Sequence, residues 1–477
     1  MLTTKVKSDL QRWNTLPLSL AGRVQTIKMN ILPRYLYLFQ CLPIFLPKSF
    51  FTKLDSMISF FIWEGKTPRI RLPLLQRVRA EGGLGLPEFR LYYWAANIHK
   101  IILWRSEPDN CWCRLEASSC VSSSIEALVC CPIPFAPSKF SNNPIVVSTL
   151  KIWNQIRKEF GWSLLTLSAP ICNNHLFLPA RMDSGFSMWE REGLINFKDL
   201  YCEGQFGGFG DLCEIYNLQR SDMFRYFQVR NFVKTHSPIF PELPARSGIE
   251  VFMPAASLAK GVVSYLYEAI PRKDPGLGKI KSSWETELGF TFSDEWWEQA
   301  TERVNSSSSC ARLSLIQFKV LHRTHYSKAR LSKIYPDVTD CCDRCSQSPG
   351  NLSHMFWSCP KLIQFWKFFF EAISEILGKT IAPCPHIAIF GIPDEEIALT
   401  NKQVNVIAFA SLIARRRILL QWKSKSPPSA KAWLIDVMSF LKLEKIKFTI
   451  RGSSDKFYNY WQPLIAYVSR LRSLSPD

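Results

Sequence analysis

Four side chains of the kind that bind metal ions lie close together in the last third of the chain. Cys342 and Cys345 are separated by two residues, His354 follows after eight more, and Cys359 after a further four. Two thiolates on a tight turn, an imidazole and a third thiolate make up the four ligands that tetrahedral Zn²⁺ requires. Because protein would fill every position, the sequence predicts a structural zinc without a reactive water. Two alternatives remain, namely buried cysteines without metal and a register in which Cys341 replaces Cys342.

The charge balance makes polyanions the expected partners. The chain has 59 Lys and Arg against 40 Asp and Glu, a net charge of +19, while 47% of its residues are hydrophobic. This composition is typical of a folded protein, so the positive charge belongs to folded surfaces. Nucleic acid ranks ahead of an anionic membrane as partner, since no lipid-directed feature occurs.

The hydrophobic pattern indicates neither secretion nor membrane insertion. The most apolar stretch, 35–47, is interrupted by Gln40 and Pro43 and falls short of the roughly 20 apolar residues that span a bilayer. The first ten residues contain Lys5, Lys7 and Asp9 and lack the apolar core of a signal peptide. We therefore expect no membrane partner and an intracellular location, in a cytoplasmic ribonucleoprotein or in the nucleus.

Apolar residues recur at helical spacing over much of the chain and predict a mainly α, multi-domain fold with a small zinc-stapled module. The clearest example is 48–61, and another helix is expected from Val24 to Ile31, with Pro33 ending it. The predicted blocks are a basic helical region at 1–105, a loop-rich connector at 106–150, a mixed region at 151–305, the zinc-bearing helical module at 306–377, and a basic helical region at 378–477.

Basic residues gather at two places that could contact phosphates. Residues 1–105 hold 16 basic and 5 acidic side chains, an excess of +11. Arg312, Lys319, Arg323 and Arg330 would form one ridge on a continuous helix, or a bent ridge if Ser327 caps a second helix. A merely solvated helix face is the alternative. The candidate nucleic-acid-binding residues are Arg23, Lys28, Arg34, Arg69, Arg71, Arg312, Lys319, Arg323 and Arg330.

Two further patterns favour a structural interpretation. Aromatic and basic residues alternate over 224–230, a combination that could stack on bases, but packing of Phe224 and Phe227 in the core is the favoured interpretation. His322 and His325 lie within the basic stretch 312–333, and we expect them to be ordinary surface residues.

The catalytic motifs of common enzyme classes do not occur in the sequence. There is no G-x-G-x-x-G, H-E-x-x-H or G-x-S-x-G, and Phe60 occupies the position where a phosphate-binding loop ending at Gly65-Lys66-Thr67 needs its first glycine. No two aspartates are adjacent, although two-metal nucleotidyl transfer needs clustered carboxylates. We therefore expect the chain not to be an enzyme.

Several segments together resemble the part of LINE-type non-LTR retrotransposon reverse transcriptases that follows the catalytic palm. The segments are, in order, Trp13 with 18–23 and 27–33, 60–63, 82–87, 318–323, the Cys-Cys-His-Cys group, 357–360, 365–366, 415–423 and 443–446. The resemblance implies a thumb-like region, a wrist-like segment and a cysteine-rich carboxy-terminal domain that grip the element's RNA and assist target-primed reverse transcription. It also implies that the palm and endonuclease would lie before Met1.

The expected function is thus a non-catalytic, zinc-containing nucleic-acid-binding fragment of a retrotransposon reverse transcriptase. RNA is the expected partner, target DNA is another, and a separate reverse transcriptase core could be a third. The alternatives are a zinc-stapled scaffold for protein interactions, one half of a split polymerase, and a decayed reading frame without a selected role.

Overall fold

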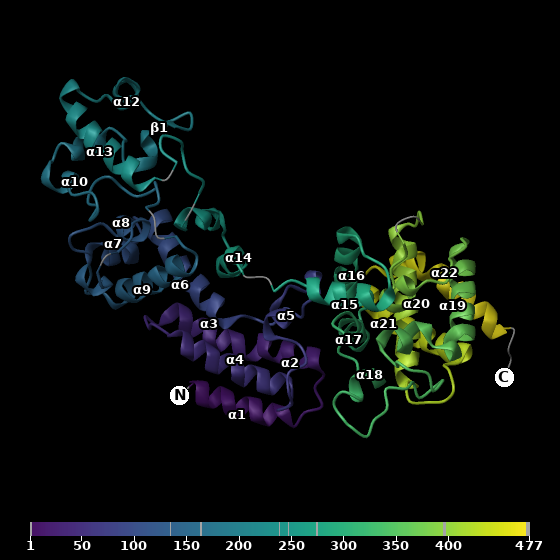
Figure 1. Ribbon diagram of the computed structural model, residues 1–477. Coiled ribbons are helices and arrows are strands. Elements are labelled where there is room, and N and C mark those ends of the chain that lie inside the picture. The colour runs from purple at the N-terminus through teal and green to yellow at the C-terminus, as the bar shows by residue number, and fades with distance from the viewer. Residues whose placement is uncertain are drawn as a thin grey trace. The chain divides into compact units, whose positions relative to one another are not determined.

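The fold is mainly α, as the hydrophobic pattern predicts (Figure 1). The computed structural model describes residues 2–133, 135–162, 165–237, 239–246, 248–272, 275–394 and 397–473. Within these ranges the one sheet is an antiparallel hairpin of β1 (Tyr201–Cys202) and β2 (Gln205–Phe206). None of the described helices combines the length and the apolar character needed to cross a membrane.

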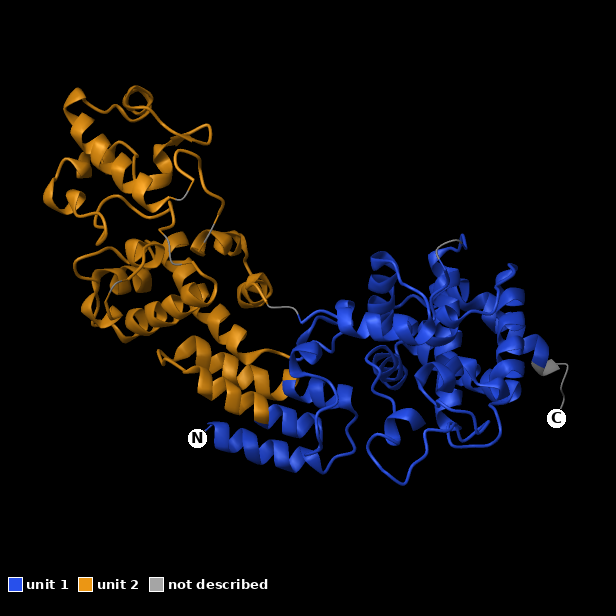
Figure 2. Cartoon of the chain, in the orientation of Figure 1, with its two compact units in different colours: residues 1–27, 57–86, 274–477 blue, residues 28–56, 87–273 orange. Residues whose placement is uncertain are grey.

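The chain forms two compact units, each discontinuous in sequence (Figure 2). Unit 1 comprises residues 1–27, 57–86 and 274–477, and unit 2 comprises 28–56 and 87–273. The predicted blocks, in contrast, are contiguous, and the basic block 1–105 is divided between the units. Helix α4 (Lys48–Ile62) spans the division at residue 56.

Unit 1 holds the carboxy-terminal helices and the predicted metal ligands. Its α-helices are α1 (Leu2–Asn14), α2 (Leu20–Thr26), α5 (Leu72–Gln76), α15 (Gly278–Leu288), α16 (Asp294–Ser306), α17 (Ala311–Leu321), α18 (Lys328–Leu331), α19 (Ile363–Leu377), α20 (Asn401–Leu420), α21 (Ala430–Ile450) and α22 (Ser454–Ser473). Two π-helical turns cover His354–Ser358 and His386–Phe390, and a 3₁₀ turn covers Arg79–Glu81.

Helix α20 forms the centre of the carboxy-terminal part of unit 1. Its middle section, 406–414, is buried throughout, and the helix is packed by the π-helical turn at His386–Phe390 and by α17, α21 and α22. The helix begins with a capping box, in which the Thr400 hydroxyl accepts from the Gln403 backbone and the Gln403 side chain accepts from the Thr400 backbone. Trp433 of α21 donates from its indole nitrogen to the carbonyl of Ala410 at 3.1 Å, which fixes α21 against α20.

Unit 2 is organised around α6 (Phe89–Ser106), which contacts α3 (Leu32–Cys41), α9 (Pro144–Glu159) and α14 (Val262–Ala269). Tyr93 and Trp94 of α6 are buried. The Tyr93 hydroxyl donates to the carbonyl of Ile44 and accepts from the amide of Leu46, so its polar end is satisfied in the interior. The remaining helices are α7 (Cys111–Ser118), α8 (Ile125–Cys130), α10 (Pro179–Met182), α11 (Phe186–Arg191), α12 (Phe209–Tyr216) and α13 (Met223–His236).

Pro33 does not end the helix before it, so that prediction was wrong. Helical backbone continues from α2 through a π-helical turn at Ile27–Ile31 into α3, and Pro33 lies in the first turn of α3. Proline is tolerated in a first turn because its missing N–H would have no helical partner there.

The predicted core packing of Phe224 and Phe227 was also wrong. The two side chains are 71% and 49% exposed, whereas Tyr226, Val229 and Val233 form the buried face of α13. Both faces of this helix carry apolar residues, so the hydrophobic pattern alone could not identify the buried one.

Candidate metal centre and its basic surroundings

The structure brings the four predicted metal ligands together in unit 1. Ligand atoms of Cys342, Cys345, His354 and Cys359 all lie within 4.8 Å of one another. The Sγ atoms of Cys342 and Cys359 are 4.0 Å apart, and Cys345 Sγ is 3.2 Å from His354 Nε2. With Zn–S bonds of about 2.3 Å, tetrahedral geometry separates two sulfur ligands by about 3.8 Å. The group therefore fits a Zn²⁺ ion.

The loop that carries Cys342 and Cys345 is closed by backbone hydrogen bonds. The Cys342 amide donates to the Gln347 carbonyl at 2.9 Å, and the Ser346 amide donates back to the Cys342 carbonyl at 2.8 Å. Gly350 donates to the carbonyl of Asp340 at 2.7 Å. A Cβ atom at Gly350 would lie 2.9 Å from that oxygen, so the close approach requires glycine.

His354 and Cys359 come from the π-helical turn and its end. The Asn351 side chain accepts from the His354 amide at 2.8 Å and from the Ser353 hydroxyl at 3.0 Å, which fixes the start of the turn. The amide of Cys359 donates to the carbonyl of His354 at 3.2 Å. The two ligands are thereby held at opposite ends of one short segment.

The ligand group is largely shielded from water. Cys342, His354 and Cys359 are buried, and Cys345 is half-buried. Burial raises the pKa of Cys359 to about 11, and burial together with the Arg344 guanidinium lowers the pKa of His354. Cys341 lies outside the group, with its sulfur 3.9 Å from Asp340 Oδ1. With four protein ligands, a bound ion would have no open coordination position, so its role would be structural.

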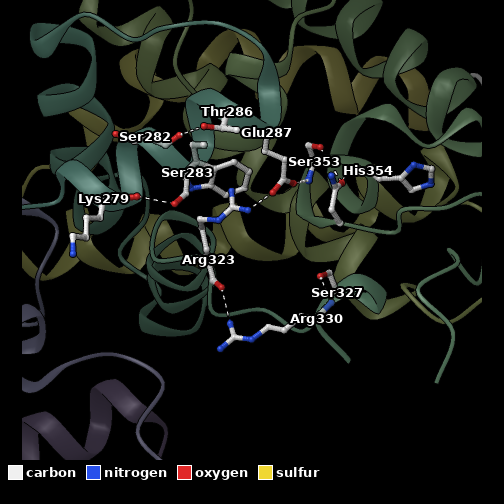
Figure 3. Close-up of polar contacts among 12 residues, drawn as sticks. Lys279, Ser282, Ser283, Thr286, Glu287, Arg323, Ser327, Arg330, Ser353 and His354 are labelled. Atoms are coloured by element: carbon white, nitrogen blue, oxygen red, sulfur yellow. Dashed lines mark hydrogen bonds and ion pairs between the residues drawn. The ribbon is translucent and has the colours of Figure 1, made fainter. Parts of the chain in front are cut away.

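Glu287 of α15 connects Arg323 to the metal-ligand segment, which is the segment 353–359 that carries His354 and Cys359. One carboxylate oxygen accepts from the Ser353 amide at 2.6 Å, next to ligand His354, and the other pairs with the Arg323 guanidinium (Figure 3). The Arg323 carbonyl in turn accepts from the Arg330 guanidinium at 2.9 Å. These contacts link α15, the end of α17 and α18.

The continuous basic ridge does not form, because α17 ends at Leu321. Arg323 has a left-handed backbone with φ of 54°, and the Ser327 hydroxyl accepts from the Arg330 amide to cap α18. Ser327 thus caps a second helix, as the bent alternative requires, and the continuous helix was wrong. Arg312 stays exposed on α17, while Lys319 and Arg330 are half-buried.

Two of the candidate phosphate contacts form ion pairs inside unit 1. Arg23 is buried, pairs with Glu64 at 3.2 Å and donates to the Phe61 carbonyl at 3.0 Å. Arg323 pairs with Glu287, and its guanidinium lies 4.3 Å from the centre of the Trp284 ring. In this arrangement both side chains make contacts that stabilise unit 1.

The other candidates lie nearer the surface. Arg69, Arg71 and Arg312 are exposed in unit 1, and Lys28 and Arg34 are half-buried in unit 2. Arg69 and Lys319 come from distant parts of the sequence, yet both line one cleft together with Arg330. The sequence pattern could not show this proximity.

His322 is not a surface residue, so that prediction was wrong. It is buried, and its Nε2 lies 2.7 Å from the Gly82 carbonyl. His325 is half-buried, with Nε2 3.4 Å from the Ile316 carbonyl. Burial lowers the pKa of each histidine to about 4. They follow a buried helix end, which a count of basic neighbours could not reveal.

Sequence reasoning missed a second group of metal-type side chains. Cys384, His386 and Asp394 bring ligand atoms within 4.8 Å of one another, and His386 Nδ1 contacts the Asp394 carboxylate. Three aromatic rings, those of Phe290, Phe292 and Trp296, surround the imidazole. The Cys-x-His spacing was the one available signal.

No protein-family model matches this chain. The motifs that resemble LINE-type reverse transcriptases thus give an expectation about family, while the fold and the ligand geometry are direct observations. Functional assignment consequently depends on what the charges and the metal-ligand group can do.

Proposed function

We propose that this chain is a non-catalytic nucleic-acid-binding segment of a retrotransposon-type reverse transcriptase. A structural Zn²⁺ held by Cys342, Cys345, His354 and Cys359 would stabilise the part of unit 1 that presents basic side chains. RNA is the proposed main partner, and single-stranded target DNA would be bound by the same charges.

The observation that carries this proposal is the uneven distribution of charge between the two units. Unit 1 holds 36 Lys and Arg against 22 Asp and Glu, a net charge of +14, whereas unit 2 holds 23 against 18, a net charge of +5. The metal-ligand group lies in the same unit as most of the excess. A cationic surface of this kind attracts the phosphate backbone of nucleic acids.

The metal-ligand loop supports the basic helix α18 directly. The Lys328 ammonium pairs at 2.8 Å with Asp343, which lies between the ligands Cys342 and Cys345 in the sequence. The Ala329 amide donates to the Gly350 carbonyl at 3.1 Å. Because α18 is only four residues long, it depends on such tertiary contacts for its position. A metal that orders the loop would therefore also order α18.

The proposal is tested by the salt dependence of binding. We would titrate the zinc-loaded full chain into a fluorescently labelled single-stranded RNA and measure anisotropy at several salt concentrations. About five phosphate contacts would reduce affinity about 100-fold between about 50 and 200 mM salt. Absence of binding at low salt, or an affinity that does not change with salt, would contradict the proposal. Binding to an acidic protein instead of RNA would favour the alternative function, a zinc-stapled scaffold for protein interactions.

A further inference from the structure

A cleft in unit 1 collects side chains from three separate segments of the chain. Its volume is about 750 Å³, and its walls come from the turn before α2, from 62–70, and from α17 to Tyr335. Lys319, Arg69 and Arg330 line it together with Tyr326 and Tyr335. This volume lies within the range of about 300–1,000 Å³ that is typical of ligand-binding sites.

Three of the four cations that line the cleft, Lys319, Arg69 and Arg330, have no acidic partner among the described residues. Arg69 donates to the carbonyl of Thr324 at 3.4 Å, and Arg330 to that of Arg323 at 2.9 Å. The one acidic residue of the lining, Glu64, is already paired with Arg23 and Lys66. The cleft thus has a net excess of positive charge that an anion would neutralise.

The side chain of Lys319 is partly removed from water. It is half-buried on α17, and burial together with the nearby Arg69 charge lowers its pKa. Two like charges held near each other in a partly desolvated place raise the free energy of the unliganded protein. A phosphate placed between them would relieve that repulsion.

Aromatic side chains lie beside the cations. The Arg69 guanidinium lies 4.6 Å from the centre of the Tyr326 ring, and that of Arg330 lies 5.9 Å from it. Tyr335 is 55% exposed, and within the described ranges its ring contacts no other aromatic ring or cation. More than half of the Tyr335 side chain is therefore accessible to a planar group.

We infer that this cleft binds a single-stranded nucleic acid, with a backbone phosphate among Lys319, Arg69 and Arg330 and a neighbouring unpaired base stacked on Tyr335. This inference rests on the proposed nucleic-acid-binding function and names the site and the form of the ligand. A duplex keeps its bases stacked inside the helix and cannot offer one to Tyr335. Combined phosphate and stacking contacts are the usual way in which proteins bind single strands.

The test uses the zinc-loaded full chain and a labelled oligouridylate of about 12 nucleotides, a length within the range of known single-strand sites. Lys319→Met removes one phosphate contact, and we expect about tenfold weaker binding and a salt slope smaller by about 0.7. Lys367→Met is the matched control, because it removes the same charge from an exposed position on α19 of unit 1, outside the cleft. We expect less than about a twofold change for it. Lys319→Arg should restore binding.

Tyr335→Ala tests the stacking contact separately. We expect single-strand affinity to fall by about 5-fold to 100-fold with an unchanged salt slope, while affinity for a duplex of the same length stays the same. Zinc content and the thermal unfolding curve of each variant report whether it has folded.

The outcomes separate this inference from the proposed function. A wild-type protein that binds neither strand nor duplex would contradict the proposed function itself. Salt-dependent binding that Lys319→Met and Lys367→Met weaken equally, or that Tyr335→Ala leaves unchanged, would overturn only the assignment of binding to the cleft. Displacement of the strand by low-millimolar inorganic phosphate at constant ionic strength would also overturn it, because the cleft would then take a lone phosphate.

Discussion

The guanidinium of Arg323 pairs with the carboxylate of Glu287, whose second oxygen accepts a hydrogen bond from the amide next to the metal ligand His354. The same arginine supplies the backbone carbonyl that holds the Arg330 side chain. One carboxylate on α15 thus joins the metal-ligand segment to a cation of the basic cleft. Arg323, which the sequence suggested as a phosphate contact, acts here through its contacts inside unit 1.

Replacing Glu287 with Gln should weaken both the fold and metal retention. A glutamine can accept from the Ser353 amide but cannot balance the charge of Arg323, so we expect unfolding to be easier by about 1–3 kcal/mol. Zinc should also be lost to a competing chromophoric chelator at a lower chelator concentration. Glu298→Gln, an exposed change on α16, is the control and should have little effect. Equal behaviour of the two variants would mean that Glu287 does not support the metal-ligand segment.

Gly350→Ala should disturb the loop that carries Cys342. The new Cβ would lie 2.9 Å from the Asp340 carbonyl oxygen and 3.1 Å from the Cys342 nitrogen, so backbone must move. We expect a loss of about 1–3 kcal/mol in unfolding free energy and weaker zinc retention. Gly278→Ala places its Cβ in open space in α15 and should be neutral or slightly stabilising. Denaturant unfolding of the two variants distinguishes the effects, and an unaffected Gly350→Ala protein would contradict the described loop.

His322 should make the protein less stable at mildly acidic pH. Its pKa is lowered to about 4, mainly by burial and to a smaller extent by the nearby Arg77 charge, while the hydrogen bond to the Gly82 carbonyl opposes this shift. Its Nδ1 is buried without a hydrogen-bond partner, so protonation would bury an unsatisfied charge. The unfolded chain takes up the proton near pH 6.5, and stability is therefore complete above that pH and decreases toward pH 4.

Between pH 7 and pH 5, proton uptake by His322 in the unfolded chain should lower the free energy of unfolding by about 2 kcal/mol. His322→Gln keeps a donor for the Gly82 carbonyl but has no proton to take up, so its unfolding free energy should fall by less over the same interval. Both proteins keep the same metal ligands and His325, and the difference between them isolates His322. Parallel pH profiles of the two proteins would contradict the neutral, buried state of this residue.

Removal of the metal should weaken single-strand binding through α18. Without an ion the loop loses its cross-link, and the contacts of Lys328 with Asp343 and of Ala329 with Gly350 no longer hold α18 in place. We expect a protein treated with a strong chelator to bind the oligouridylate at least about tenfold more weakly, and added zinc to restore the affinity. Unchanged binding by the metal-free protein would mean that the metal does not support single-strand binding at the cleft.

The features that depend on local sequence were the ones that could be predicted. Helix α4 follows directly from apolar spacing, and the metal-ligand group from the short intervals between its cysteines and histidine. Ser327 was correctly considered as a cap, but only the structure decides between the bent and the straight arrangement, because the turn requires Arg323 to adopt a left-handed backbone.

What could not be predicted depends on contacts between distant segments. Arg69 and Lys319 are 250 residues apart and meet in one cleft, while Arg23 faces inward because Glu64 and the Phe61 carbonyl lie beside it. A charged residue on an amphipathic helix looks the same in sequence whether it pairs internally or faces a ligand. The choice is made by tertiary packing.

Metal analysis of the purified full chain shows whether Cys342, Cys345, His354 and Cys359 hold a zinc ion. We expect about one zinc ion per chain in the wild-type protein and in Cys384→Ser, and almost none when Cys342 and Cys359 are both replaced by Ser. A wild-type protein without zinc that keeps its fold in a strong chelator would contradict a structural zinc at these four residues, as would a double variant that retains its zinc.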